Sequence, residues 1–358
     1  MSTAPRAPLR SFLHQHLPQQ WQQRGWLARL LWPLSWLYGV VWQRKQRRTQ
    51  QQPPQPLPVS VLVVGNMIAG GAGKTPVTLA VVQHFQRMGV HVGVVSRGYG
   101  RDNSAPHCMA VTSDSTASEV GDEPLLIHRR TGAPVVVCAQ RLEAARALLQ
   151  HYPDTQLIVC DDGLQHLALP RDAELCVMDE RNIGNGWLLP AGPLREPWPR
   201  KTDWLLRISP TAETQQNIPL PPGQAVFHAQ RRFAAHAVRA DGATQPLAEW
   251  AAHKQPVQAL AGIAQPERFF AMLRAAGLAL QHTVALPDHA TPDILIEAAQ
   301  TLSQNPEPLL CTEKDAVKLW PHLPDVWAVP LELQMEPGFF NALTAWWQQQ
   351  QSSPHRAS

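Results

Sequence analysis

The 358-residue sequence has few cysteines and little excess charge of either sign. Its five cysteines show neither a CxxC motif nor zinc-like spacing: Cys108, Cys138, Cys160, Cys176 and Cys311. Cys138 and Cys160 lie inside apolar runs, where a buried free thiol is the expected state, and we infer a reducing, cytosolic-side compartment. The formal net charge of +3 is too small to indicate nucleic-acid binding, so we expect no nucleic-acid partner.

The N-terminal region lacks the small-residue cleavage site of a secretory signal, so we expect the chain to stay on the cytoplasmic side. It has an apolar run at residues 27–42, with tryptophans in and around it and a basic cluster directly after it. A spanning helix needs ~20 apolar residues, whereas this run is shorter and contains Pro33 and Gly39. Tryptophans and basic residues favour the lipid headgroup region, so we predict a helix in the membrane interface or a marginal span. An ordinary core helix with a solvated basic end is the alternative.

The remaining sequence predicts two α/β units, and 44% hydrophobic residues can form two cores. A proline- and glutamine-rich linker at residues 50–58 ends the N-terminal helix. Short apolar strands then alternate with helices, which indicates a doubly wound α/β sheet. The predicted strands are 59–64, 90–95, 133–138, 156–160 and 174–178, and the helices are 74–88 and 142–150. After a loop-like stretch at 210–223, a second unit is predicted with strands 257–261, 309–311 and 326–329 and helices 266–276, 292–302 and 337–348.

A glycine-rich loop, GNMIAGGAGKT, follows the first predicted strand and opens a helix. Glycines let backbone amides turn toward phosphate oxygens, and a helix N-terminus adds positive potential. The lysine of this loop would reach the outer phosphates, and the threonine would bind Mg²⁺. The loop is a variant of the usual Walker A pattern, because Ile68 stands where a glycine is usual. The residues predicted to hold the nucleoside triphosphate are Ile68, Ala69, Gly70, Gly71, Ala72, Gly73, Lys74 and Thr75.

Two adjacent carboxylates, Asp161 and Asp162, follow the predicted strand 156–160. An Asp-Asp-Gly turn is common after a strand, but in P-loop proteins an acidic residue at the end of a neighbouring strand binds the magnesium complex. We therefore predict a metal site made by Asp161, Asp162 and Thr75.

Further polar clusters occur along the chain: SRGYGR (96–101), which follows the strand predicted at 90–95, GDEP (121–124), LPAGPLRE (189–196) and LPDH (286–289). Each alone is consistent with an ordinary turn or cap. Phosphoryl transfer, however, needs positioned cations and a base for the acceptor hydroxyl, and these clusters supply both.

The ordered motifs resemble those of the tetraacyldisaccharide 4'-kinases of Gram-negative lipid A synthesis. The matching segments, from about residue 27 to residue 318, are VGNMIAGGAGKTP, VVSRGYGR, GDEP, CDDGLQH, LPAGPLRE, AGIAQPERFF, LPDH and TEKDAVK. The LLWPLSWLYG segment also resembles the N-terminal membrane helix of that family. The departures are Arg101, where a second glycine is usual, and a longer proline and glutamine lead-in.

This resemblance implies transfer of the ATP γ-phosphate, with Mg²⁺, to the 4'-hydroxyl of a tetraacylated glucosamine disaccharide 1-phosphate, which forms lipid IVA. It implies a location at the cytoplasmic face of the inner membrane, with the chain peripheral or anchored by one helix. Residues 1–50 would form the membrane-associated helix and its basic flank. Residues 51–222 would form the P-loop kinase domain, and residues 223–358 the C-terminal α/β domain.

The resemblance also implies roles for single residues. Asp122 of GDEP would take the hydroxyl proton, oriented by His289 of LPDH in the facing domain. Because these two residues come from different domains, catalysis would depend on domain closure. Lys74 would hold the phosphates, while Arg195 and Arg97 would stabilise charge.

Two alternatives are also consistent with these residues. One is a membrane-associated P-loop ATPase switch of the partitioning or metallochaperone type, although such proteins usually have lysine where Ala69 stands. The other is a non-enzymatic membrane scaffold with a nucleotide fold, against which the intact Lys74, Thr75 and Asp161–Asp162 pair argue.

Overall fold

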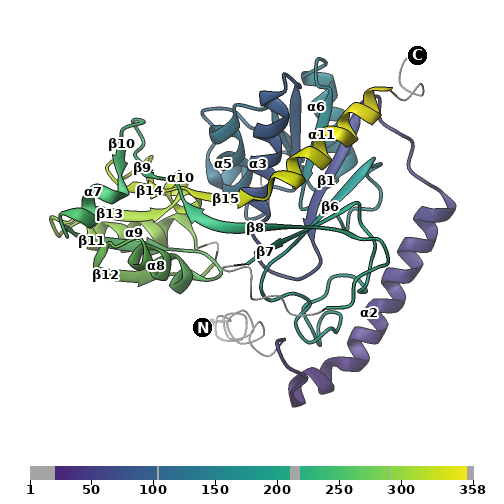
Figure 1. The fold of residues 1–358 in the computed structure, drawn as a ribbon, viewed down its shortest axis with the longest axis horizontal. Coiled ribbons are helices and arrows are strands. Elements are labelled where there is room, and N and C mark those ends of the chain that lie inside the picture. The colour runs from purple at the N-terminus through teal and green to yellow at the C-terminus, as the bar shows by residue number, and fades with distance from the viewer. Residues whose placement is uncertain (1–20, 103–104, 210–217, 289, 353–358) are drawn as a thin grey trace, which may run out of the picture.

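The structure, a computed structural model, describes residues 21–102, 105–209, 218–288 and 290–352, and two β-sheets dominate it (Figure 1). In the described residues the larger sheet has nine strands in the order β15-β8-β7-β6-β1-β5-β2-β4-β3. Its inner strands pair in parallel, while β15 and β3 run antiparallel at the two edges. In sheet order the strands span Leu331–Met335, Ala225–Phe233, Trp204–Ile208, Ala173–Met178, Ser60–Asn66, Leu157–Asp161, Val92–Ser96, Val135–Cys138 and Cys108–Ala110.

Helices cover both faces of this sheet, so β1, β2, β4 and β5 are buried along their whole length. Side chains along each strand alternate between the two faces of the sheet. In β1, Leu62 packs into one hydrophobic core and Val63 into the other. Helices α3 (Lys74–Arg87), α5 (Asp122–Thr131) and α11 (Pro337–Ser352) contribute to the first core, and α6 (Arg141–His151) to the second. The short helix α4 (Ala117–Val120) precedes α5. The predicted doubly wound α/β sheet is confirmed.

The smaller sheet has six strands among the described residues, in the order β10-β9-β14-β13-β11-β12. These span Thr244–Pro246, His236–Val238, Trp327–Val329, Leu309–Thr312, Pro256–Ala261 and Ala279–Ala285. The four strands β14, β13, β11 and β12 are parallel. Its helices are α7 (Leu247–Ala252), α8 (Pro266–Ala275), α9 (Pro292–Leu302) and α10 (Glu313–Leu319).

The chain returns to the larger sheet after building the smaller one. Strands β8 and β15 pair with each other at one edge of the larger sheet, although both follow residue 222. Helix α11 also packs on the larger sheet, through buried Phe339, Leu343 and Trp347. The division into 1–50, 51–222 and 223–358 stays a prediction, and β8, β15 and α11 belong to the layers of the P-loop unit although they follow residue 222.

Helix α2 (Trp26–Gln51) is a long helix beside the loops that follow β6 (Figure 1). It is longer than the predicted apolar run, because it continues through the basic cluster into the stretch taken as linker. Its buried residues, Ala28, Ser35, Gly39 and Trp42, recur at spacings of three, four and seven and form one face. Among the described residues, no helix has both the length and the apolar character needed to cross a membrane.

The cysteine prediction is half right. Cys160 is a buried free thiol, and so are Cys176 and Cys311. Cys138, however, forms a disulfide with Cys108, so the prediction of a free thiol there is wrong. The two residues are far apart in sequence but directly opposite each other in the β3–β4 pair, which the sequence did not predict.

Candidate active site

The P-loop connects the end of β1 to the start of α3 at Lys74. Gly70 and Gly73 have φ angles of 90° and 78°, a left-handed conformation that glycine adopts without steric cost. The Asn66 side chain lies under the loop and donates hydrogen bonds to the carbonyls of Ile68 (2.9 Å) and Gly70 (3.3 Å). The loop that was predicted to hold phosphates is therefore shaped by its own glycines and by one buried amide.

A second loop supports the P-loop from outside. The Ala69 amide donates to the Pro193 carbonyl (2.8 Å), and the Arg195 amide donates to the Met67 carbonyl (2.8 Å). Ile68 also forms an isolated β-bridge with Leu194. The LPAGPLRE segment is thus attached to the P-loop by its backbone, which brings together two segments more than 110 residues apart in the sequence.

The predicted Asp161–Asp162 pair lies beside Lys74, because β5 is the parallel neighbour of β1. The Lys74 ammonium is 3.6 Å from Asp162, and the Arg195 guanidinium is 2.9 Å from the same carboxylate. Asp161 is buried and accepts a hydrogen bond from the Thr78 hydroxyl (3.0 Å), one turn after Thr75. The structure therefore brings the predicted lysine, arginine and both aspartates together.

The two aspartates have opposite electrostatic environments. Burial, reinforced by the charges of Glu123 and Asp162, raises the pKa of Asp161 to about 7, although Lys74 acts against this. Burial would also raise the pKa of Asp162, but the charges of Lys74 and Arg195 hold it below its ordinary value. A cation beside Asp161 would relieve this repulsion, and carboxylate oxygens are ligands that Mg²⁺ prefers. The donor set fits the predicted magnesium ion.

Asp122 begins helix α5 and is buried between two lysines of α10. Its carboxylate is 3.0 Å from the Lys318 ammonium and 3.8 Å from that of Lys314. The preceding Gly121 has a φ of 92°, and a Cβ there would lie 2.9 Å from the Tyr99 carbonyl, so the tight approach of the SRGYGR and GDEP loops requires glycine.

His289, the predicted partner of Asp122, lies outside the described residues, and its role stays a prediction. Its neighbour Asp288 is 3.6 Å from Lys314, which also lies 3.3 Å from Glu123. Burial opposes the charge on Lys314, but the carboxylates around it hold its pKa above the ordinary value. One partly buried ammonium thus connects the LPDH segment with the GDEP segment. The TEKDAVK motif that carries it had no predicted role.

Arg195 and Arg97, the two arginines expected to stabilise charge, lie in different surroundings. The Arg195 backbone carbonyl accepts a hydrogen bond from the Tyr38 hydroxyl (2.6 Å), so helix α2 contacts the loop that carries this arginine. Arg97 is exposed at the end of β2. Its charge acts on His166, whose pKa is lowered to about 4 by burial and by the cations Arg141, Lys45 and Arg97.

A set of arginines near the P-loop was not predicted. Arg181, in the loop after β6, donates a hydrogen bond to the Gly71 carbonyl (2.5 Å) and pairs with Asp179 (2.8 Å). Glu180 next to it pairs with Arg231 of β8 and with Arg268 of α8. A small pocket adjoins these residues, lined by Met178, Asp179, Glu180, Asn182, Arg207, Ile208, Ser209 and His228. The signal in the sequence was a charged DER triplet directly after an apolar strand.

The chain is similar to known proteins of one family. The family model for tetraacyldisaccharide-1-P 4'-kinase matches residues 27–348. The chain is 51% identical to the tetraacyldisaccharide 4'-kinase of Acidovorax sp. (strain JS42), over 96% of each chain. It is 50% identical to the enzyme of the same name from Polaromonas naphthalenivorans, over 92% of this chain and 94% of the other.

The fold also resembles a solved structure. A crystal structure of the "apo" form of LpxK from Aquifex aeolicus in complex with ATP superposes with a TM-score of 0.75 at 25% identity, covering 89% of this chain and 99% of that chain. The residues that the family model matches include the P-loop, the aspartate pair and the GDEP loop described above. The chain therefore belongs to the tetraacyldisaccharide-1-P 4'-kinase family.

Proposed function

We propose that this kinase transfers the γ-phosphate of ATP to the 4'-hydroxyl of a tetraacylated glucosamine disaccharide 1-phosphate, which forms lipid IVA. The observation that carries the proposal is the ion pair of Lys74 with Asp162 beside the buried Asp161, in a chain that the family model covers from residue 27 to residue 348. Glu123, directly after Asp122, is close enough for its charge to raise the pKa of Asp161, which supports placing the proposed base near the proposed metal site.

The phosphates of ATP would lie on the P-loop amides of residues 68–75. Lys74 would leave its ion pair with Asp162 and contact the outer phosphates, and Arg181 is close enough to Gly71 to add a second cation. Thr75, Asp161 and Asp162 would hold Mg²⁺, which neutralises phosphate charge during the transfer when it is bound. Arg195 beside Asp162 would stabilise the charge that develops on the phosphoryl group.

Asp122 would take the proton of the acceptor hydroxyl. Lys318 and Lys314 hold its carboxylate at the start of α5, and both lysines belong to the helix that links α5 to the smaller sheet. His289 would orient Asp122 from the LPDH segment, for which the Asp288–Lys314 ion pair supplies the physical connection. Closure of the smaller unit on the larger would then assemble the base and exclude water from the phosphate.

Helix α2 would place the site at a lipid surface. One face packs on the loop that carries Leu188 and Arg195, where Ser35 donates to the Leu188 carbonyl (2.8 Å) and Tyr38 donates to the Arg195 carbonyl. The rest of the helix surface exposes large apolar side chains: Trp26, Leu30, Trp32, Leu34, Trp36, Leu37 and Val41. Such a face with a basic C-terminal end suits the interface of an anionic membrane. We propose that the protein lies at the cytoplasmic face of the inner membrane with this face in the headgroup region.

The experiment that tests the activity supplies labelled ATP, Mg²⁺ and the disaccharide 1-phosphate lipid in detergent to the purified protein. The expected product carries a second phosphate on the sugar, and it should be absent with Lys74→Met but present with Lys201→Met, which changes an exposed lysine. ATP hydrolysis that proceeds without glycolipid and produces no phosphorylated lipid would contradict the proposal and favour a P-loop ATPase switch.

A further inference from the structure

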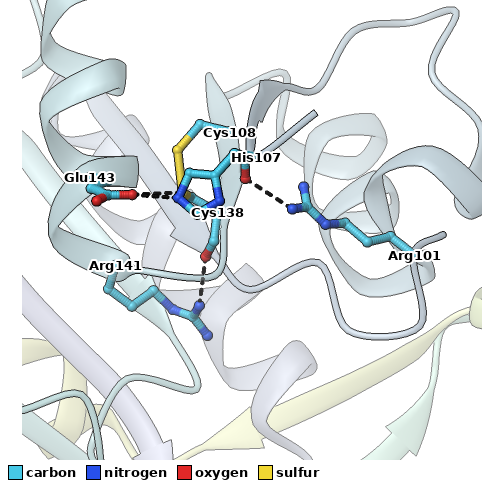
Figure 2. Close-up of a disulfide and its surroundings, with 6 residues drawn as sticks. All are labelled: Arg101, His107, Cys108, Cys138, Arg141 and Glu143. Atoms are coloured by element: carbon cyan, nitrogen blue, oxygen red, sulfur yellow. Dashed lines mark hydrogen bonds and ion pairs between the residues drawn. A yellow bond between two sulfur atoms is a disulfide. The ribbon is translucent and has the colours of Figure 1, made fainter. Parts of the chain in front are cut away.

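A second cluster of reactive side chains lies at the β3 edge of the larger sheet, outside the site described above. The antiparallel β3–β4 pair places Cys108 opposite Cys138, with 4.4 Å between their Cα atoms and a disulfide between their sulfurs. His107 and Glu143 flank this disulfide, as Figure 2 shows. The four potential ligand atoms all lie within 4.8 Å of one another.

The contacts of His107 and Glu143 point to more than a structural disulfide. The His107 Nε2 atom is 2.6 Å from the Glu143 carboxylate, and the Cys138 sulfur is 3.7 Å from the same carboxylate oxygen. A disulfide needs neither an imidazole nor a carboxylate beside it. Two sulfurs, one nitrogen and one oxygen lie within 4.8 Å of one another, and together they are a donor set that could hold a metal ion.

The chemistry of these donors selects the metal. Thiolate and imidazole ligands favour Zn²⁺ over Mg²⁺ and Ca²⁺, which prefer oxygen. Bonds of ~2.0–2.3 Å in a tetrahedral zinc site place neighbouring ligand atoms ~3.3–3.8 Å apart. The Cys138–Glu143 distance already has this value, and the His107–Glu143 distance is shorter by under ~1 Å. Only the two sulfurs have to separate substantially.

The backbone around the cluster is held by hydrogen bonds to its carbonyl groups. Arg101 donates to the His107 carbonyl (2.9 Å), and Arg141 donates to the Cys138 carbonyl (3.1 Å; Figure 2). Arg141 also reaches the Asp161 carbonyl at 3.4 Å, so the same side chain connects this edge to the strand that ends at the active site. The side chains of His107 and Glu143 are 61% and 41% exposed, which leaves an ion open access from solvent.

We propose that the dithiol form of Cys108 and Cys138 binds one Zn²⁺ ion together with His107 and Glu143, and that the disulfide is the oxidised, metal-free form. A thiol reductant breaks the S–S bond with two electrons and two protons and is itself oxidised to a disulfide. Zinc binding then releases the two thiol protons. Because ATP is a cytosolic substrate and cytosolic thiols keep cysteines reduced, the dithiol is the form expected where the kinase works. The bound ion would fasten β3 to the first turn of α6.

The test uses the full-length protein, freed of metal with a chelator and reduced with a phosphine. Zinc is titrated in competition with a chromogenic zinc indicator, and one ion per chain should bind. Oxidation to the disulfide, or the double variant Cys108→Ser with Cys138→Ser, should weaken binding at least ~100-fold, and His107→Ala or Glu143→Gln at least ~10-fold. The matched controls His282→Ala and Glu297→Gln, at exposed positions elsewhere, should bind like the unchanged protein.

A second readout does not depend on the variants folding normally. Cobalt(II) added to the reduced, unchanged protein should give the intense visible absorption of a tetrahedral site with thiolate ligands, and zinc should abolish it. If reduced protein fails to compete with the indicator, or if the double cysteine variant retains zinc binding, the proposal is refuted. Kinase activity is not the readout, so this result is independent of the function proposed above.

Discussion

The ion pair between Asp122 and Lys318 makes it possible to test whether Asp122 is a catalytic base or only a structural carboxylate. The two charged atoms are 3.0 Å apart, and the side chains are only 3% and 7% exposed. Removing one partner of a buried pair leaves an uncompensated charge and costs roughly 3–5 kcal/mol. Asp122→Asn keeps the shape of the side chain, and Lys314 retains contacts with Glu123 and Asp288, so we expect the lower end, about 3 kcal/mol.

The variant Lys318→Met should also destabilise the protein, and the double variant should be less unstable than the sum of the two. We expect a coupling energy of about 2 kcal/mol, because the double variant contains neither buried charge of the pair. Turnover should behave differently. Loss of a general base lowers the rate by ~10²–10⁴-fold, and a ~10³-fold loss corresponds to about 4 kcal/mol in the activation free energy.

The assay compares the four proteins by chemical denaturation and by turnover at saturating ATP and glycolipid. We expect the double variant to recover stability and to remain as slow as Asp122→Asn. If its turnover returns to that of Lys318→Met, then Asp122 only anchors α5 to α10, and the assignment of Asp122 as the base is refuted.

Three further outcomes are expected. Lys74→Met should lower turnover at least ~100-fold, because an ammonium that stabilises phosphate charge is lost, measured with MgATP and glycolipid. Trp32→Ser and Trp36→Ser should each weaken binding to anionic phospholipid vesicles about 10-fold, since each removes an aromatic ring from the exposed face of α2. His84→Gln should reduce the loss of stability below pH ~6.5. Burial, and then the charge of Arg87, lower the pKa of His84 in the folded protein. As the pH falls, His84 therefore takes up a proton more readily in the unfolded chain, and unfolding is favoured as the pH falls through the lowered pKa.

Matched controls accompany these variants. Ile294→Ser changes an exposed apolar residue on α9 and should leave vesicle binding unchanged. His282→Gln changes an exposed histidine and should leave the acid limb of the stability curve in place. If both tryptophan variants bind vesicles as tightly as the unchanged protein, α2 does not enter the lipid surface. A steeper acid limb in His84→Gln would show that its neutral form does not stabilise the fold.

Many of the helices and strands were predictable because their signals are local. The buried strands β1, β2, β4, β5 and β6 are short apolar runs, and their observed limits lie within about two residues of the predicted ones. The P-loop was predictable because its glycines and Lys74 act through adjacent backbone. Strands β8 and β12 were missed, since exposed residues interrupt their apolar pattern.

The candidate site was only partly predictable. Asp161, Asp162 and Arg195 were identified as candidates, but the ion pairs that join Lys74 and Arg195 to Asp162 depend on strand order and on a loop that crosses from residue 189. Lys314 and Lys318 had no assigned role, because a lysine pair on a short helix has no meaning until the helix packs against α5. The comparisons establish the family, and the roles of these single residues remain proposals.

The sequence by itself determined the phosphate loop, the acidic end of its neighbouring strand and the apolar N-terminal helix, because each depends on residues that are close along the chain. Only the tertiary structure decided that Asp122 lies between two lysines, that α2 contacts the loop that carries Arg195, and that Cys108 meets Cys138 beside His107 and Glu143. Contacts of this kind arise from the order and register of strands. Those are set by how all the apolar faces pack together, and no local pattern encodes them.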